Sequence, residues 1–384
     1  MTRTPAGGGG SHTAHGADAG PIRVLHVLQS GDRGGVQRHV RDLALGLRDT
    51  TAGVAVGTTG WLTETLRDEG LPVSLLPGLQ RGLRPDRIAV AAHSLRVTTS
   101  ALGATMIHAH GVLALAAAAF LGPRPPLLYT AHGMQWRDPT HGTTVRAASR
   151  AFHRWVARRG MVAAVIAISS QEEADAIAMG FPPTTVHRVP HGVCTDLPQA
   201  AARLATRPTN VLGVATRLVP GKGLRDILQA AARIPETQVV IAGDGPLLQP
   251  LHRTVADLGI SGRVQFLGWQ ERLDVFYASI TLFISMSRKE GLPYSVLDAM
   301  ARGVPVIASD IPGHRDLIVN GETGFLVDAG PALVTRVKQL LRDAPLRAQI
   351  ALASTARVRA HFAICDMLRR QRSVEVATWQ ALRS

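Results

Sequence analysis

Two carboxylates, Glu290 and Asp298, lie eight residues apart in the stretch SRKEGLPYSVLDAMARG, residues 287–303. Pro293 suits the first turn of a helix, because the N–H group that proline lacks would have no intrahelical partner there. The glycine that closes the stretch suits the other end, where the chain often turns left-handed. The stretch therefore predicts a helix over residues 293–302.

A short apolar run, TLFIS at 281–285, precedes this helix and is typical of a buried strand. A strand followed by a helix places Glu290 on the connecting loop and Asp298 about a turn and a half inside the helix. The free N–H groups and the positive dipole end of the helix face the space near Glu290. This unit therefore predicts an anion site.

The same alternation of short apolar runs and helical segments fills the chain from Pro21 onward. In the first half, the predicted strands are Ile22–Leu28, Gly53–Gly57, Val73–Leu76, Thr105–His108, Leu127–Tyr129, Val165–Ile168 and His187–Val189. In the second half, they are Val211–Ala215, Val239–Ala242, Val264–Phe266, Thr281–Ser285, Val304–Ala308 and Gly324–Val327. Strands that alternate with helices indicate parallel sheets covered on both faces. We therefore predict an α/β protein of two doubly wound, Rossmann-like domains that face each other across a cleft.

The chain of 384 residues is longer than a domain with one ordinary hydrophobic core, and its length fits two domains. An Ala-rich, polar segment without strand character separates the halves, so we predict domains over 21–196 and 209–365 and a linker over 197–208. Residues 1–20 are rich in Gly, Thr and His and contain no apolar run. We expect them to form a disordered tail and no signal peptide.

The sequence lacks the marks of a membrane-spanning or secreted protein. Its longest apolar run, Val112–Leu121, is far shorter than a membrane span. Cys194 and Cys365 are too few for the disulfide framework of a small secreted domain, so a reducing compartment is the simpler interpretation. We therefore expect a cytoplasmic protein.

The net charge of +14 implies attraction to an anionic partner. Nucleic acid is disfavoured, because the sequence shows no aromatic-plus-basic stacking pattern, no zinc spacing and no obvious recognition helix. An anionic membrane surface fits better, because segment 146–159 combines several arginines with Phe152 and Trp155, as interfacial helices do. The alternative is an ordinary surface helix whose apolar stripe faces the core. We expect the protein either free in the cytoplasm or peripheral at the inner face of the membrane.

Small and polar residues follow the predicted strands of the first half, at the edge where such sheets bind ligands. Gly34 and Gly35 would let a phosphate or sugar approach the backbone at a helix start, although many tight turns look the same. His108, His110 and His132 follow two later strands and could touch hydroxyls or phosphates, yet each alone is more often structural. Zinc could bind these three, but no carboxylate or cysteine is placed nearby, so we predict no metal site.

The loop after the first strand of the second half carries Arg217 and Lys222 and opens a helix. An Arg fork and a Lys charge at a helix start would bind a pyrophosphate, with about 1.5–3 kcal/mol from each charge-assisted hydrogen bond. The alternative is a solvated loop with two incidental cations. Gly243 belongs to a common turn, GDGP, before a helix, and Leu267 follows the third strand, where backbone groups could line a base pocket.

Taken together, these motifs resemble the retaining glycosyltransferases of family 4, which have the GT-B fold. The resemblance spans nearly the whole chain and depends on the order of its motifs, which are Gly34-Gly35, His132, Arg217 with Lys222, GDGP at 243–246, and Glu290 through Asp298. It implies a hexosyltransferase that takes its sugar from a nucleotide-diphosphate sugar, retains the anomeric configuration and requires no metal or other cofactor. It also implies that the first domain binds the acceptor and that residues 366–384 form a helix crossing back to that domain.

The resemblance implies a role for each matching residue. Arg217 and Lys222 would hold the diphosphate, and Glu290 would contact the donor sugar near its 3- and 4-hydroxyls. His132 would touch the sugar 6-hydroxyl and the reacting centre, so these four residues are the candidate catalytic groups. The implied donor site consists of Gly34, Gly35, Arg217, Lys222, Gly243, Leu267, Glu290, Gly291, Leu292, Tyr294, Ser295 and Asp298.

Four positions depart from the family pattern. Asp298, which would take the ribose hydroxyls, stands where a glutamate is usual, so that contact would be longer or reached through water. His191 and Cys194 stand where Asn and Asp are usual, near the hinge and the cleft. Gln37 replaces a frequent glutamate beside Gly35, which would approach the phosphates. None of these changes removes the phosphate clamp.

The leading hypothesis is a glycosyltransferase that builds a cell-surface polysaccharide or glycolipid on a saccharide or lipid-linked acceptor. The shortened carboxylate at Asp298 motivates one alternative, a non-catalytic nucleotide-sugar-binding subunit of a glycosyltransferase complex. A nucleotide-sugar hydrolase or epimerase on the same fold is a third interpretation. It would need a histidine as its general acid or base.

Overall fold

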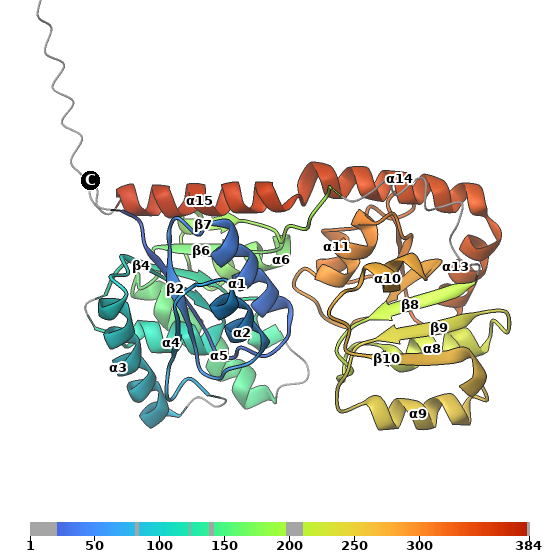
Figure 1. Ribbon diagram of the computed structural model, residues 1–384, viewed down its shortest axis with the longest axis horizontal. Coiled ribbons are helices and arrows are strands. Elements are labelled where there is room, and N and C mark those ends of the chain that lie inside the picture. The colour runs from blue at the N-terminus through green and yellow to red at the C-terminus, as the bar shows by residue number, and fades with distance from the viewer. Residues whose placement is uncertain (1–20, 81–83, 123, 138–141, 197–209, 382–384) are drawn as a thin grey trace, which may run out of the picture.

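Two α/β domains lie side by side, and a C-terminal helical segment runs along both of them (Figure 1). The computed structural model describes residues 21–80, 84–122, 124–137, 142–196 and 210–381. The predicted tail (1–20) and linker (197–208) lie outside the described residues. Each domain has a parallel sheet covered by helices, so the predicted fold class, with two Rossmann-like domains in the GT-B arrangement, is confirmed.

The first domain contains a seven-stranded sheet with the order β3-β2-β1-β4-β5-β6-β7. Its strands are β1 (Val24–Leu28), β2 (Thr51–Val56), β3 (Val73–Leu75), β4 (Met106–His110), β5 (Leu127–Thr130), β6 (Ala164–Ala167) and β7 (Val186–Arg188). Its helices are α1 (Gly35–Gly46), α2 (Trp61–Asp68), α3 (Pro85–Ala101), α4 (Val112–Ala119), η1 (Gln135–Arg137), α5 (Thr143–Arg158), α6 (Ser170–Ala178) and η2 (Pro183–Thr185). The strand order reverses between β1 and β4, and doubly wound sheets bind ligands outside the carboxyl ends of the strands at such a point.

The second domain contains a six-stranded sheet with the order β10-β9-β8-β11-β12-β13. Its strands are β8 (Val211–Ala215), β9 (Gln238–Ala242), β10 (Val264–Gly268), β11 (Leu282–Ser285), β12 (Val306–Ser309) and β13 (Phe325–Val327). Its helices are α8 (Leu224–Ala232), α9 (Leu248–Asp257), η3 (Ser261–Arg263), α10 (Asp274–Ala278), α11 (Tyr294–Ala301), α12 (Pro312–Arg315), α13 (Pro331–Arg342) and α14 (Ala344–His361). The predicted strands of both domains are present, with ends shifted by at most 2 residues. The predicted helix over 293–302 is α11, and Pro293 is its N-cap.

The last helix, α15 (Ile364–Ala381), leaves the second domain and packs on the first (Figure 1). Its buried residues Met367 and Val374 join a core cluster with Val24 of β1 and Leu43 of α1. A parallel bridge between Val193 and Ala363 marks the crossing. The predicted return of the C-terminal helix is confirmed, although the helix begins at Ile364 rather than at residue 366.

One carboxyl group of α15 is buried against the first domain. Glu375 is 1 % exposed, and Gln371 Nε2 donates to its Oε1 at 2.9 Å. Burial raises the pKa of Glu375 to about 7, although Arg372 opposes this rise and Asp49 adds to it. Because the pKa is higher in the folded than in the unfolded chain, folding favours the protonated carboxyl. The stabilising effect is therefore complete below about pH 4.5 and is lost as the pH rises through about 7.

Glu375→Gln is expected to remove this loss, because its side chain stays neutral at every pH. The free energy of unfolding of the wild type should fall between pH 5 and pH 8 by roughly 2–3 kcal/mol more than that of the variant. Urea denaturation at several pH values measures the difference, with exposed Glu236→Gln as the matched control. Parallel pH profiles for wild type and Glu375→Gln would contradict the assignment.

Helix α5 turns its apolar stripe toward the core. His153 and Val156 are buried, and Phe152 and Trp155 pack against the core cluster of the first domain. The inward-facing alternative for this segment is therefore correct for its apolar residues, while Arg154 and Arg158 are exposed. Within the described ranges, none of the helices combines the length and the apolar character that a membrane span requires.

Candidate active site

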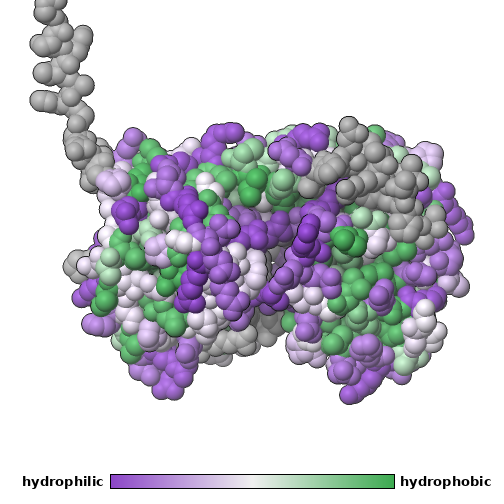
Figure 2. Space-filling model, viewed as in Figure 1, coloured by the Kyte–Doolittle hydropathy of each residue, from purple (hydrophilic) through white to green (hydrophobic). Residues whose placement is uncertain are grey.

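The carboxyl ends of the two sheets meet where the domains adjoin, and a cavity of 730 Å³ lies there. Its lining comes from both domains and includes Gly133 and Arg150 from the first and Lys289, Glu290 and Gly291 from the second. On the face shown in Figure 2, hydrophilic residues gather along the junction of the domains. A cavity of this size and polarity can hold a sugar and its attached phosphate groups.

Lys222 and Glu290 form an ion pair in this region. Lys222 Nζ lies 2.6 Å from Glu290 Oε1, and the two side chains are only 18 % and 16 % exposed. Glu290 lies on the loop that leads to α11, as predicted, and the fold brings it to a cation of the predicted phosphate clamp. A ligand that carries both phosphate and hydroxyl groups offers each member of this pair a new partner.

The backbone ties the Lys222 loop to the segment that carries Glu290. Gly221 O accepts a hydrogen bond of 2.8 Å from Arg288 N. Gly223 has a left-handed φ of 65°, and a Cβ there would lie 2.0 Å from Met286 O, so only glycine fits. Arg217, the other predicted cation, is exposed on the same loop.

The first turn of α11 faces this region. Gly291 and Leu292 precede the helix, no side chain among the described residues caps it, and its first N–H groups therefore remain available to an anion. His191 Nδ1 lies 2.9 Å from Leu292 O, and the His191 ring stacks on Tyr294 with centroids 4.3 Å apart. Ser295 O accepts a hydrogen bond of 3.0 Å from the Tyr277 hydroxyl. His191, a departure from the family pattern, thus holds the entry to α11.

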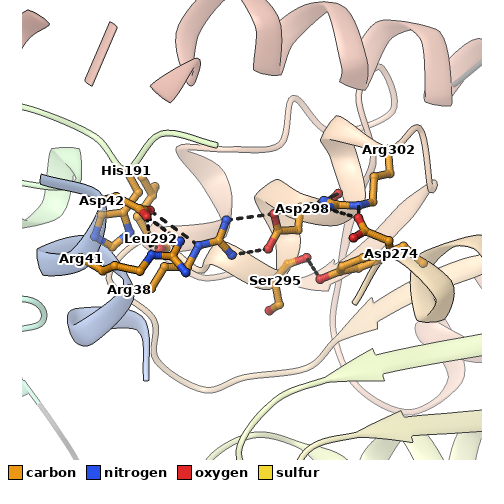
Figure 3. Close-up of polar contacts among 10 residues, drawn as sticks. Arg38, Arg41, Asp42, His191, Asp274, Leu292, Ser295, Asp298 and Arg302 are labelled. Atoms are coloured by element: carbon orange, nitrogen blue, oxygen red, sulfur yellow. Dashed lines mark hydrogen bonds and ion pairs between the residues drawn. The ribbon is translucent and has the colours of Figure 1, made fainter. Parts of the chain in front are cut away.

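Asp298 joins the two domains through an ion pair (Figure 3). Arg38 of α1 donates to its two carboxylate oxygens at 2.5 and 3.1 Å, and Arg302 Nη1 donates at 3.2 Å. The guanidinium of Arg38 also lies 4.3 Å from the centroid of the Tyr294 ring. The carboxylate of Asp298 is only 7 % exposed, so its predicted ribose contact would require Arg38 to move or to share it.

Asp298→Asn is expected to lower the free energy of unfolding by roughly 1–3 kcal/mol, because it leaves the partly buried Arg38 with only the more distant carboxylate of Asp42, 3.8 Å away. Asp274→Asn is the matched control, since Asp274 binds the same Arg302 but is half exposed. Loss of the Asp274 carboxylate should lower the free energy of unfolding by under about 0.5 kcal/mol. Chemical denaturation measures both variants, and equal effects at the two positions would refute a domain-bridging role for Asp298.

The predicted glycines and Leu267 lie where loops approach closely. Gly34 precedes α1, and a Cβ at Gly35 would lie 3.8 Å from the Tyr294 ring, so the glycine pair adjoins the start of α11. Gly243 has φ 143°, and a Cβ there would lie 1.8 Å from Thr216 O, which excludes any other residue. Leu267 is half-buried on β10, and its carbonyl accepts a hydrogen bond from Gln270.

His132 follows β5 in a conformation that non-glycine residues rarely adopt, with φ 54°. Such backbone strain costs on the order of 1 kcal/mol and is common at functional sites. Its Nε2 lies 3.0 Å from His110 Nδ1, and burial lowers the pKa of His132 well below its ordinary value. The imidazole is therefore neutral at pH 7 and can donate or accept a hydrogen bond at a substrate hydroxyl.

Two residues that shape the site, Arg38 and Glu172, were not among the predicted site residues. Glu172 is 4 % exposed and accepts hydrogen bonds from the backbone N–H groups of Gly133 and Ile168, so it holds the turn that carries His132. Burial raises its pKa to about 7. A capping-box pattern, Ser169 with Glu172 three residues later, marks this glutamate in the sequence. Nothing in the sequence near Arg38 points to its partner 260 residues away.

Two family models match the chain: one described as Glycosyltransferase Family 4 over residues 33–197, and one described as Glycosyl transferases group 1 over residues 200–357. A mannosyltransferase of Mycolicibacterium smegmatis is 31% identical over 286 residues, which are 68% of this chain and 74% of that protein. The chain belongs to glycosyltransferase family 4. Its glycosyltransferase class follows from this membership.

Other similar proteins match either over a shorter part of this chain or over most of it at lower sequence identity. The lipopolysaccharide core biosynthesis glycosyltransferase LpsE of Rhizobium meliloti is 35% identical over 137 residues, which cover 35% of this chain and 40% of LpsE. The structure of Anabaena HepE in complex with UDP-glucose has a TM-score of 0.80 at 23% identity and covers 93% of this chain and 100% of HepE. Sucrose-phosphate synthase from Thermosynechococcus elongatus has a TM-score of 0.79 at 19% identity, covering 94% of this chain and 100% of that one. These likenesses support the GT-B fold.

Proposed function

We propose that this family 4 glycosyltransferase transfers a hexose from a nucleotide-diphosphate sugar, with retention and without a catalytic metal ion. The acceptor would be a saccharide or lipid-linked precursor of a cell-surface polysaccharide or glycolipid. The observation that carries the proposal is the meeting of Lys222, Glu290 and the uncapped start of α11 beside a cavity lined by both domains. This arrangement offers cations to a diphosphate and a carboxylate to sugar hydroxyls.

The departing nucleoside diphosphate gains negative charge as the glycosidic bond breaks. Lys222, Arg217 and the N–H groups at the start of α11 would stabilise this charge from fixed positions, which is the work that a divalent cation does in other transferases. Donor binding would draw Lys222 toward the phosphates and free Glu290 for the 3- and 4-hydroxyls of the sugar. The ion pair between them keeps both groups in place until the donor arrives.

Retention in this mechanism does not use a carboxylate nucleophile on the back face of the sugar, as retaining glycosidases do. The acceptor would instead attack from the face that the diphosphate leaves, and the leaving phosphate would take the acceptor proton. His132 would contact the sugar 6-hydroxyl beside the reacting centre. Its neutral ring and its strained, firmly held backbone suit a positioning role.

An anionic acceptor fits the wall of the cavity that belongs to the first domain and the adjoining loop. Arg146, Arg150 and Arg288 line it together with Trp136. A fourth arginine, Arg137, is already paired with Asp175. Relatives are named for acceptors of this kind: phosphatidylinositol monomannoside for the mycobacterial mannosyltransferase, and an undecaprenol-linked diphosphate for a galactosyltransferase of Escherichia coli. LpsE and similar proteins are named for lipopolysaccharide core biosynthesis. We therefore place the acceptor in surface glycan assembly.

A screen of UDP, GDP and ADP and of their sugars by calorimetry identifies the base and sugar. Release of the nucleoside diphosphate is then measured without added metal, with and without a glycolipid acceptor. Acceptor-dependent release supports transfer, and retention is read from the anomeric configuration of the product by NMR. Tight donor binding without turnover, rescued by a co-expressed partner, would favour the non-catalytic subunit, which the Arg38–Asp298 pair also permits. Release of a stable sugar product without acceptor would favour a hydrolase or epimerase.

Peripheral membrane binding is expected from the net charge of +14 and the outward-facing arginines of α5. The protein should float with liposomes that contain anionic lipid, and the bound fraction should fall as salt rises from 0.05 to about 0.5 M, because salt screens the attraction. Replacing Arg154 and Arg158 by Gln should weaken flotation, whereas Arg342→Gln on α13 should not. Binding that is absent or independent of salt would contradict this location.

A further inference from the structure

Six histidine rings pack together over the C-terminal halves of β1 and β4 and the segments beside them: His26, His39, His108, His110, His132 and His191. All except His132 are at most 4 % exposed. Four ring nitrogens of the cluster are buried and find no hydrogen-bond partner among the described residues. A buried polar atom without a partner destabilises the folded state, so a ligand that engaged such nitrogens would stabilise the fold.

Sheet geometry makes His26, His108 and His110 converge. β1 and β4 are parallel neighbours, and His26 lies opposite His108 in their register. His110 is two residues further along β4 and therefore projects from the same face of the sheet. One ring nitrogen of each of the three lies within 4.8 Å of the others.

Hydrogen bonds determine which nitrogen each ring offers. His108 Nε2 is 2.8 Å from Thr130 Oγ1, which leaves His108 Nδ1 as a buried atom without a partner among the described residues. His110 Nδ1 is 3.0 Å from His132 Nε2, so His110 Nε2 faces His26 Nδ1, at 3.1 Å. In metal sites, outer hydrogen bonds of this kind fix the orientation and the tautomer of the ligating histidines.

Coordination needs one lone pair from each ring, so each neutral imidazole would keep its proton on the nitrogen that faces away from the ion. His108 Nε2 and His110 Nδ1 already have hydrogen-bond partners, Thr130 Oγ1 and His132 Nε2, and this suits such an arrangement.

We propose that His26, His108 and His110 form a buried binding site for one divalent transition-metal ion, with Zn²⁺ as the reference metal. Three imidazoles suit zinc, cobalt, nickel or copper, whereas magnesium and calcium prefer oxygen ligands. Nitrogens about 2.0–2.1 Å from a tetrahedral zinc ion are roughly 3.3–3.4 Å apart, so His26 and His110 need to separate by only a few tenths of an ångström. A water molecule would complete the shell.

The ion would stabilise the first domain and would not enter the transfer reaction. Its ligands belong to β1 and β4, whereas the proposed diphosphate clamp belongs to the second domain. Its effect on the site would be indirect, through the hydrogen bond from His110 that orients His132. The earlier prediction of no metal site considered His108, His110 and His132, and it left out His26, which only the pairing of β1 with β4 brings to this place.

The test measures metal content directly, on full-length protein purified without a histidine tag. His12 and His15 are replaced by Asn throughout, so that the N-terminal segment contributes no ligand. After incubation with excess Zn²⁺ or Co²⁺ and gel filtration, we expect about one ion per chain by mass spectrometry. The cobalt form should show the visible absorption of a four-coordinate, nitrogen-ligated site. If the histidines are joined only by hydrogen bonds, the folded protein will retain no metal after gel filtration. That result would overturn the proposal.

Variants identify the ligands. His26→Gln and His108→Gln should each lower metal affinity at least about tenfold. Tenfold is the smallest loss typical for residues that only hydrogen-bond to a metal ligand, and a ligand itself should matter more. His153→Gln is the matched control, because His153 is equally buried but bonds to Tyr129, away from the cluster. Equal retention by wild type and both cluster variants would exclude these ligands. If the cluster variants fail to fold, X-ray absorption on the wild type decides: imidazole nitrogens at about 2.0–2.1 Å support the site, and an oxygen shell refutes it.

Discussion

Lys222→Ala is expected to lower kcat/KM for sugar transfer at least about a hundredfold, the scale for losing a group that stabilises developing charge. Lys222 is partly buried beside Glu290, and Gly223 and Gly221 tie its loop to the segment before α11. Its charge therefore acts from a fixed position and with little screening by water. Because the same charge meets the phosphates of the bound donor, the affinity for the free nucleoside diphosphate should fall as well.

The sequence contains three lysines, and the third offers a matched control. Lys338 lies on α13, away from the junction of the domains, so Lys338→Ala should leave both kinetics and nucleotide affinity within about twofold. Lys222→Arg would restore part of the activity if charge alone matters, and less if a compact ammonium is needed. Unchanged kcat/KM in Lys222→Ala would sink the proposed phosphate clamp.

Glu290→Gln is expected to lower kcat at least about a hundredfold, but with a different signature. The variant keeps the size of the side chain and releases Lys222 from its ion pair. The affinity for the nucleoside diphosphate should therefore stay the same or rise. The additional affinity that the nucleotide sugar has over the free diphosphate should be lost. Glu290 acts on the hydroxyls of the sugar in the proposed mechanism, and an amide binds them more weakly than a carboxylate.

Calorimetry with the diphosphate and with the nucleotide sugar separates the two effects. Exposed Glu322→Gln is the control and should bind both ligands as the wild type does. If Glu290→Gln weakened the binding of the diphosphate as strongly as Lys222→Ala does, Glu290 would act on the phosphate site and not on the sugar. An active variant with wild-type kcat would remove Glu290 from the candidate catalytic residues.

The order of elements and the position of most candidate residues followed from the sequence alone. Apolar runs of strand length, glycines and prolines at their ends, and helical segments between them are local signals, and both sheets of the structure follow them. Pro293 marked the start of α11, and Glu290 therefore had to lie on the loop before it. These features depend on residues close together in the chain, whose conformational preferences act before any tertiary contact forms.

The partners of those residues were decided only by the tertiary structure. Asp298 pairs with Arg38 across the domain boundary, Lys222 pairs with Glu290 68 residues later, and His26 meets His108 through the register of β1 and β4. Glu375 acquired its raised pKa because α15 crosses back and is buried on the first domain. Charge pairing, burial and metal ligation depend on distances of a few ångströms between segments far apart in the chain. The sequence determined which groups were available, and the packing of the two domains determined which of them meet.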